Sequence, residues 1–170
     1  MTKPTIGFIG VGFMGHGMAK NIVENGYPLV TMAHRKRDAV DDLIKRGATE
    51  AKSPKEIAEQ SDIIHLCVTG SPQVEANIRG ENGLLAGLRP GAIIVDCSTS
   101  DPVSTLTLKA EIEAAGGHFA DAPLARTPKE AWEGTLDTMV GASPEVFEKI
   151  KPVLDCWAGL LQLRNFLTPT

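Results

Sequence analysis

Long apolar runs are missing from this sequence, and so is a large excess of charge of either sign. The N-terminal stretch MTKPTIGFIG has one lysine and an apolar run that glycine soon breaks, which excludes a signal peptide and a membrane span at this end. The 17 basic and 21 acidic side chains give a net charge of −4, which provides no field for binding nucleic acid or an anionic membrane. We therefore expect a cytoplasmic protein with neither partner.

Cysteine is also scarce. Cys67, Cys97 and Cys156 are odd in number and widely spaced, and the first two lie inside apolar runs. This pattern predicts reduced core residues rather than a disulfide framework. No histidine pair has metal-ligand spacing to a cysteine, so no metal site is expected.

What the sequence does contain is an alternation of apolar and amphipathic segments. With 170 residues, of which 42% are hydrophobic, the chain is long enough to bury the core of one domain. The apolar segments predict strands at 5–9, 29–33, 63–68, 92–96, 118–122 and 138–141. The segments between them predict helices at 15–24, 39–45, 54–59, 72–78, 103–115 and 144–154.

Four of these helices have the same start signal, a capping side chain followed by proline in the first turn. The predicted N-caps are Ser53, Ser71, Asp101 and Ser143. Strands such as IIHLCV and AIIVD are apolar almost throughout, which is typical of a sheet covered on both sides. The predicted fold class is therefore α/β, a doubly wound, mostly parallel sheet with helices on both faces.

Glycine is concentrated in the stretch GFIGVGFMGHGMAKNI. Gly10, Gly12 and Gly15 form G-x-G-x-x-G between the first strand and the first helix. The first glycine permits the turn, the second lets a diphosphate approach the backbone, and the third allows close packing of helix and strand. The helix N-terminus then offers N–H groups to the phosphates. The motif predicts dinucleotide binding by a Rossmann domain; the alternative is a glycine-rich turn without a ligand.

The end of the second predicted strand indicates which dinucleotide is bound. An acidic residue there suits the ribose 2′-OH of NAD, whereas basic residues suit the 2′-phosphate of NADP. The sequence reads MAHRKRDAV, with no carboxylate before Asp38. We infer NADP(H), with NAD as the alternative cofactor, and Arg35 as the main phosphate ligand because a guanidinium binds phosphate with several donors. The alternative is that HRKR is a solvated loop.

Three motifs in order resemble those of the β-hydroxyacid dehydrogenases. This family includes 3-hydroxyisobutyrate dehydrogenases and tartronate semialdehyde reductases and is related to 6-phosphogluconate dehydrogenase. The glycine stretch is similar to its N-terminal signature, DCSTSDP (96–102) to its D-x-S-T-x-x-P, and DAPLARTPKEAWEGTLDTMVGA (121–142) to its D-A-P-V-S-G-G motif. The resemblance implies reversible hydride transfer between nicotinamide and a small β-hydroxyacid or semialdehyde.

In the second motif, the resemblance implies that Thr99 contacts the cofactor near the nicotinamide ribose and that Ser98 helps to hold the substrate. Both residues follow a predicted strand that ends at Asp96, at the edge where doubly wound sheets bind ligands. The alternative is that the two hydroxyls cap the helix that begins near Pro102.

The third motif departs from the family. Where the family has S-G-G, which holds the substrate carboxylate, this chain has Ala125, Arg126 and Thr127. Arg126 would hold a larger or more highly charged anion, with Thr127 donating beside it. The Arg-Thr pair is similar to that of sulfolactaldehyde-type reductases, which leaves a sulfonate open as the substrate. The alternative is that Arg126 points into solvent.

The family's proton donor is a lysine on a helix that follows the cofactor domain, and no lysine occurs after Lys151. We therefore predict a Rossmann domain over 1–158 and an irregular tail, or the start of the interdomain helix, over 159–170. We predict no all-helical second domain in this chain. The chain is expected to be inactive alone; the alternative is a non-enzymatic module that binds a dinucleotide or a protein partner.

The predicted sites can be stated together. No catalytic residue is expected in this chain, a small anion is the expected substrate, and a homodimer is left open. The predicted substrate-binding residues are Ser98, Arg126 and Thr127. The predicted cofactor-binding residues are Gly10, Gly12, Phe13, Met14, Gly15, His34, Arg35, Lys36, Val68 and Thr99.

Overall fold

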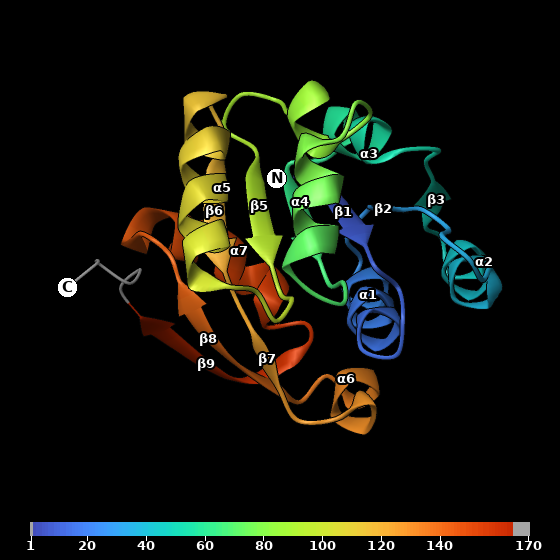
Figure 1. The fold of residues 1–170 in the computed structure, drawn as a ribbon. Helices are drawn as coiled ribbons and strands as arrows, with labels where there is room; N and C mark the ends of the chain where they lie inside the picture. Colours follow the sequence, from blue (N-terminus) through green and yellow to red (C-terminus); the bar gives the residue numbers. More distant parts are fainter. Residues whose placement is uncertain (1, 165–170) are drawn as a thin grey trace.

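Short apolar segments form the strands of a single sheet in the computed structural model, which describes residues 2–164 (Figure 1). The strand order is β3-β2-β1-β4-β5-β6-β8-β7, with β9 also paired to β8. Neighbouring strands from β3 to β6 are parallel, β8 is antiparallel to β6 and β7, and β9 is parallel to β8. The strands are β1 (Ile6–Ile9), β2 (Leu29–Thr31), β3 (Thr49–Glu50), β4 (Ile63–Leu66), β5 (Ile93–Asp96), β6 (His118–Asp121), β7 (Leu124–Ala125), β8 (Leu136–Gly141) and β9 (Ala158–Arg164).

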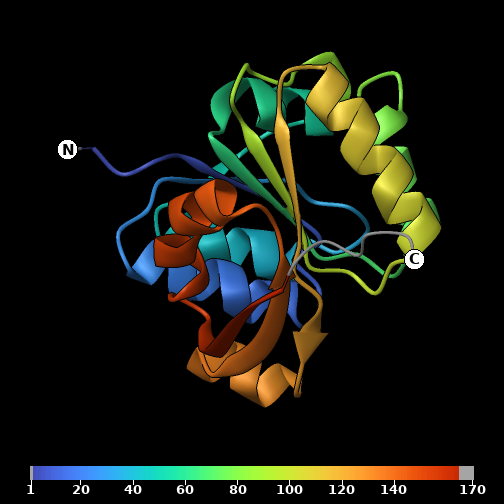
Figure 2. The same ribbon diagram turned by 90° about the vertical axis from the view of Figure 1, so that its left-hand side faces the viewer.

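Helices cover both faces of this sheet, as Figures 1 and 2 show from two sides. One buried cluster lies between the strands and α1, α2, α6 and α7, and a second lies between the strands and α3, α4 and α5. The predicted doubly wound, mostly parallel α/β fold is confirmed. The helices are α1 (Gly15–Glu24), α2 (Asp38–Lys45), α3 (Pro54–Gln60), α4 (Ser71–Arg79), α5 (Pro102–Ala114), α6 (Pro128–Glu133) and α7 (Pro144–Leu154), with a 3₁₀ turn η1 (Leu84–Ala86).

The first cluster contains an unusual group of rings. His65 of β4 is fully buried, stacks on Phe8 of β1 with ring centroids 5.6 Å apart, and meets Trp157 edge-on at 6.1 Å. Within residues 2–164, neither imidazole nitrogen has a hydrogen-bond partner, and nor has the indole Nε1 of Trp157. Burial lowers the pKa of His65 to about 3, because a charged imidazolium would be desolvated there. His65 is therefore a neutral core residue.

Most of the predicted helix starts are confirmed. The side chains of Ser53, Asp101 and Ser143 each accept a backbone N–H in the first turn of α3, α5 and α7. The prediction for Ser71 was wrong, since Gly70 is the N-cap of α4. The Ser71 hydroxyl is instead used between loops, where its Oγ accepts the Asp101 N–H at 2.7 Å.

The structure differs most from the sequence-based prediction after residue 122. Helix α6 and strand β7 were not predicted, although Thr127 and Glu130 form a capping box at the start of α6. The expectation of an irregular tail or helix from residue 159 was wrong for the described part, because 159–164 continue as β9. Pairing with β8 provides hydrogen-bond partners for the backbone groups along one edge of β9. The rest of the predicted tail, 165–170, lies outside the described residues.

The β8–β9 end of the sheet is covered on one face only. The cluster beneath α3, α4 and α5 contains no described residue beyond Phe119 of β6. Met139 on β8 and Leu160 on β9 are about half exposed, and the outer edge of β9 pairs with no other strand of the described chain. Residues 2–164 include no helix with the length and apolarity needed to cross a membrane.

Candidate functional site

Most of the predicted site residues lie in loops that leave one edge of the sheet, and Gly15 is the first residue of α1. Because β1, β2, β4, β5 and β6 are parallel, their carboxyl ends meet at this edge, where doubly wound folds bind their ligands. Direct contacts join the loops. The Val68 N–H donates to Ser98 Oγ at 3.0 Å, and Gly70 packs near the Thr99 carbonyl. The predicted site segments after β4 and β5 are therefore neighbouring loops.

Two glycines of the first loop are required by close packing. Gly10 has φ +97°, and a Cβ there would lie 2.1 Å from the Cys67 carbonyl oxygen at the end of β4. A Cβ on Gly15 would lie 2.0 Å from the Gly10 carbonyl oxygen and 2.9 Å from the Phe8 ring. These contacts turn the chain sharply and bring the start of α1 against β1.

Gly12 differs from both, because a Cβ there would meet nothing within 4 Å. The first turn of α1 beside it has no side-chain cap and no acidic residue. Phe13 is 92% exposed, and Met14, half-buried, is the N-cap residue. Open space at Gly12, beside a helix start that has no side-chain cap, fits the approach of a diphosphate and argues against a purely structural glycine turn.

The segment after β2 contains both free and paired cations. The side chains of His34, Arg35 and Lys36 are exposed and make no hydrogen bond or ion pair with any other residue of the 2–164 range. Arg37 binds Glu50 at the end of β3 through both carboxylate oxygens, each 2.9 Å from a guanidinium nitrogen. Sequence reasoning missed Glu50, which is far along the chain from HRKR but adjacent to β2 in the sheet.

After β5, the chain makes a tight hydrogen-bonded turn. Ser98 is buried, and its N–H donates to Asp96 Oδ1 at 2.9 Å, while the Ser100 hydroxyl donates to Asp96 Oδ2 at 2.7 Å. Thr99 is exposed. The alternative role of Ser98 and Thr99 as helix caps was wrong, because Asp101 caps α5 through the Ser104 N–H.

Two carboxyl groups lie side by side at the same edge. Asp96 and Asp121 are paired in register at the ends of β5 and β6. Burial raises the pKa of both, and the neighbouring Asp96 helps to raise the pKa of Asp121 to about 6. Their alignment comes from strand register, which spacing in the sequence did not show.

The predicted substrate loop lies between β7 and α6. Arg126 is exposed and has φ +89°, and its Nε donates to Asp137 Oδ2 of β8 at 2.7 Å. The Thr127 side chain is occupied in the capping box, where it bonds with Glu130 and accepts the Lys129 N–H. Arg126 is thus anchored at Nε, whereas Thr127 orders the start of α6.

Helix α6 is held against α1, the helix of the glycine loop. The Asn21 side chain donates to the Ala131 carbonyl at 2.9 Å, and a Cβ on Gly17 would lie 2.6 Å from the Ala131 carbonyl carbon. His16 meets Trp132 edge-on at 5.3 Å and bonds with Asp42 of α2. The substrate loop is therefore fixed through α6 to the helix that the glycine loop begins.

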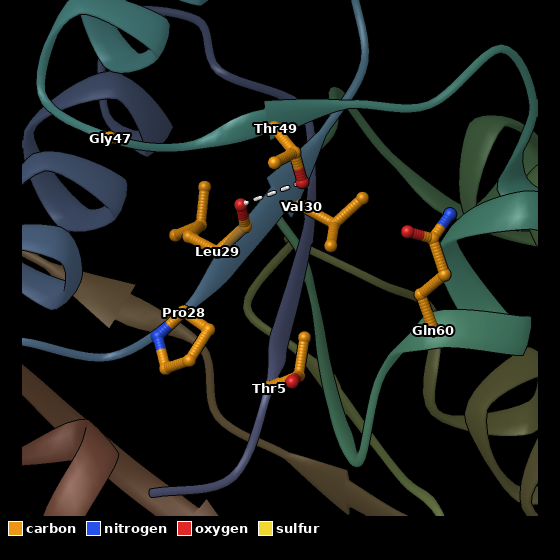
Figure 3. A pocket seen from close by; sticks show the side chains of 7 residues that line it. All are labelled: Thr5, Pro28, Leu29, Val30, Gly47, Thr49 and Gln60. Carbon is orange, nitrogen blue, oxygen red and sulfur yellow. Dashed lines mark hydrogen bonds between the residues drawn. The ribbon is translucent and has the colours of Figure 1, made fainter.

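A hollow of about 370 Å³ lies elsewhere, at the amino ends of β1, β2 and β3 (Figure 3). Pro28, Leu29 and Val30 form its apolar part, and Thr5 and Gln60 stand at its polar sides. Its position is opposite the glycine loop, and it contains none of the predicted site residues.

Comparison with known proteins identifies relatives over almost the whole chain. Residues 5–165 match the family model described as the NAD binding domain of 6-phosphogluconate dehydrogenase. The chain is 38% identical to 2-hydroxy-3-oxopropionate reductase of Escherichia coli K12, covering 88% of this chain and 51% of the relative. It is 37% identical to mitochondrial 3-hydroxyisobutyrate dehydrogenase of Bos taurus, covering 91% and 46%.

Among solved structures, Psf3 in complex with NADP+ and 2-OPP superposes with a TM-score of 0.87 at 28% identity, covering 94% of this chain and 56% of that chain. The chain spans about half the length of the curated relatives it matches. The resemblance stated from the three sequence motifs is confirmed.

Proposed function

Since the chain belongs to the family of the NAD binding domain of 6-phosphogluconate dehydrogenase, we propose that it binds NADP(H) in preference to NAD(H) at the carboxyl edge of its sheet. In this proposal it is the cofactor-binding part of an oxidoreductase that acts on a small β-hydroxyacid or semialdehyde. The names of its relatives support that substrate class. When bound, the nicotinamide would supply or accept the hydride.

The glycine loop would hold the diphosphate. Gly12 leaves room for it, and the uncapped N–H groups of α1 would donate to its oxygens. Phe13 and Met14 would line the same loop. Val68 and Thr99, in the loops after β4 and β5, would contact the nicotinamide half of the molecule.

The observation that carries the preference for NADP(H) is the free charge after β2. Arg35 and Lys36 have no partner in the described chain, so both are available to a 2′-phosphate, with His34 beside them. A guanidinium can bind phosphate through two parallel hydrogen bonds. The solvated-loop alternative predicts no difference between the two dinucleotides.

A small anionic substrate would bind to Arg126, whose Nη1 and Nη2 groups make no hydrogen bond within residues 2–164, while Nε is bonded to Asp137. Ser98 would contribute at the buried side of the site. Thr127 would act through the order that it gives to the start of α6, because its hydroxyl is bonded to Glu130. The homodimer stays a prediction.

We propose that residues 1–170 bind the cofactor without turning over substrate by themselves, because residues 152–170 contain no lysine that could act as the proton donor that the resemblance implies. A positioned general acid contributes about 10²- to 10⁴-fold to a rate. The alternative function, a non-enzymatic binding module, makes the same prediction for turnover. The two differ in whether a second domain supplied in trans restores reduction of 2-hydroxy-3-oxopropionate.

The test is a titration of the purified chain with NADPH and with NADH, followed by nicotinamide fluorescence. We expect tighter binding of NADPH, and we expect Arg35→Ala to remove most of the difference between the cofactors. Arg89→Ala is the matched control, because Arg89 pairs with Asp62 at the opposite edge of the sheet. Equal binding of both cofactors would refute the preference for NADP(H), and binding of neither would refute the proposed function.

A further inference from the structure

An acidic residue lies at the end of β2 after all, although it belongs to another strand. Glu50 ends β3, is paired in register with Thr31 of β2, and is followed by Ala51, whose N–H donates to the Thr31 carbonyl at 2.8 Å. The chain runs from Thr31 directly into the segment His34–Lys36. An acid at the end of the second strand is the feature that suits the ribose 2′-OH of NAD.

Arg37 forms an ion pair with the Glu50 carboxylate. Its two terminal nitrogens each bind one oxygen of Glu50 at 2.9 Å, and one of them also bonds with Asp41 at 3.2 Å. The guanidinium lowers the pKa of the Glu50 carboxyl, with a further contribution from the Ala33 backbone N–H. The carboxylate is thus ionised, and both of its oxygens are bound.

The pairing changes the charge that a cofactor would meet. Of the three cations at positions 35–37, Arg35 and Lys36 have no partner within residues 2–164, whereas the charge of Arg37 is neutralised by Glu50. If Arg37 were neutral, the Glu50 carboxylate would be uncompensated beside the two free cations. A carboxylate repels a phosphate dianion and accepts a hydrogen bond from a ribose hydroxyl.

We propose that Arg37 is a specificity-determining residue that acts through Glu50: by occupying this carboxylate, it keeps the end of β2 selective for the 2′-phosphate of NADP(H). This inference rests on the proposed function. It assigns to the ion pair a role in cofactor choice, beyond joining α2 to β3.

The test uses four forms of the chain: wild type, Arg37→Met, Glu50→Gln and the double variant. Each is titrated with NADPH and with NADH at low and at high salt. We expect Arg37→Met to weaken NADPH about tenfold, the size expected for one uncompensated charge several ångströms from a dianion, and to leave NADH unchanged or slightly tighter. High salt should reduce this difference.

The double variant decides the mechanism. If Arg37 acts by neutralising Glu50, removing both charges restores NADPH binding to within about threefold of wild type, because the pair is neutral in wild type and absent in the double variant. If NADPH binding stays weak in the double variant, Arg37 contacts the phosphate itself and the proposal is overturned. If Arg37→Met weakens the binding of NADPH and of NADH equally, the Arg37–Glu50 pair has only a structural role, and the proposal is also overturned.

Failure of this inference can be told apart from failure of the proposed function. A wild-type chain that binds neither cofactor contradicts the proposed function. A wild-type chain that prefers NADPH, loses the preference on Arg35→Ala, and keeps it on Arg37→Met contradicts only the role of Arg37. Because the pair is exposed, we expect all four forms to melt within a few degrees of one another.

Discussion

The parallel part of the sheet, from β1 to β6, and the part that follows it are held together by different means. In the first part, strands such as β4 and β5 are buried along their whole length. In the second part, β7 has two residues, α6 has six, and most of β9 is exposed. The second part therefore depends on contacts with the first.

Contacts of this kind include the hydrogen bond from Asn21 of α1 to the last turn of α6 and the packing of Trp157 on His65 of β4. A helix of six residues is not stable by itself in water, since nucleation costs more than so few hydrogen bonds return. The order of the candidate substrate loop is thus a property of the whole domain.

Acidification should have the largest effect, because it charges the residue at which the two parts meet. The unfolded chain binds a proton at His65 near the ordinary pKa of 6.5, whereas the folded chain does so only near 3. The contribution of His65 to the free energy of unfolding is therefore fully present above pH 6.5 and falls as the pH approaches 3, by as much as roughly 5 kcal/mol. Urea denaturation at several pH values measures this slope, which His65→Leu should flatten. An equally steep slope in His65→Leu would assign it to other groups.

Within the first part, substitutions of Gly10 and Gly12 should separate a loss of stability from a loss of cofactor binding. Gly10→Ala should cost about 3 kcal/mol of unfolding free energy, because the new Cβ would meet the Cys67 carbonyl in a left-handed backbone conformation. Gly12→Ala has open space and should cost less than about 1 kcal/mol while weakening NADPH binding more than tenfold. Thermal unfolding measures the stability of both variants, and titration with NADPH measures their cofactor binding. Similar stability losses in the two variants would contradict this account.

Asn21→Leu should destabilise the second part of the sheet without destabilising α1 in the first part. The Ala131 carbonyl would lose its buried donor, which costs about 2 kcal/mol, and amide hydrogen exchange should accelerate in α6 ahead of α1. Asn77→Leu is the matched control, because Asn77 bonds only within its own exposed helix turn. Unchanged exchange in α6 would show that the capping box alone holds this helix.

Asp121→Asn should have the smallest effect, with a pH dependence opposite to that of His65. The folded pKa of Asp121, about 6, lies above its ordinary value of 3.8, so stability is present at low pH and is lost as the pH rises through 6. Above pH 7, the amide variant should be more stable by roughly 1–2 kcal/mol, with no difference near pH 4. Chemical denaturation of the variant and the wild type at these two pH values measures this difference in unfolding free energy, with Asp155→Asn as a surface control.

The fold and the glycine edge could be predicted because their signals are local. A glycine with a required φ, a capping serine before proline and an apolar strand of four residues each act on their immediate neighbours. The role of Gly12, by contrast with Gly10 and Gly15, is visible in the sequence only through the motif, and in the structure through the open space beside it.

The features that were missed depend on contacts between distant segments. Glu50 reaches the end of β2 because a two-residue strand pairs there, and no property of residues 49–50 alone predicts this pairing. The register that aligns Asp96 with Asp121 and the hydrogen bond from the Asn21 amide to the last turn of α6 are of the same kind. Only Thr127 and Glu130 carried a local signal, and recognising that capping box would have predicted α6.

The outer edge of β9 has a practical consequence for anyone who handles this protein. Its backbone groups, which pair with no other strand within residues 2–164, lie beside the half-exposed Leu160 and Leu163, and an edge of this kind accepts further strands from other molecules. Strand addition of this kind increases with protein concentration. We therefore expect yield, solubility and tolerance of freezing to depend on keeping the sample dilute.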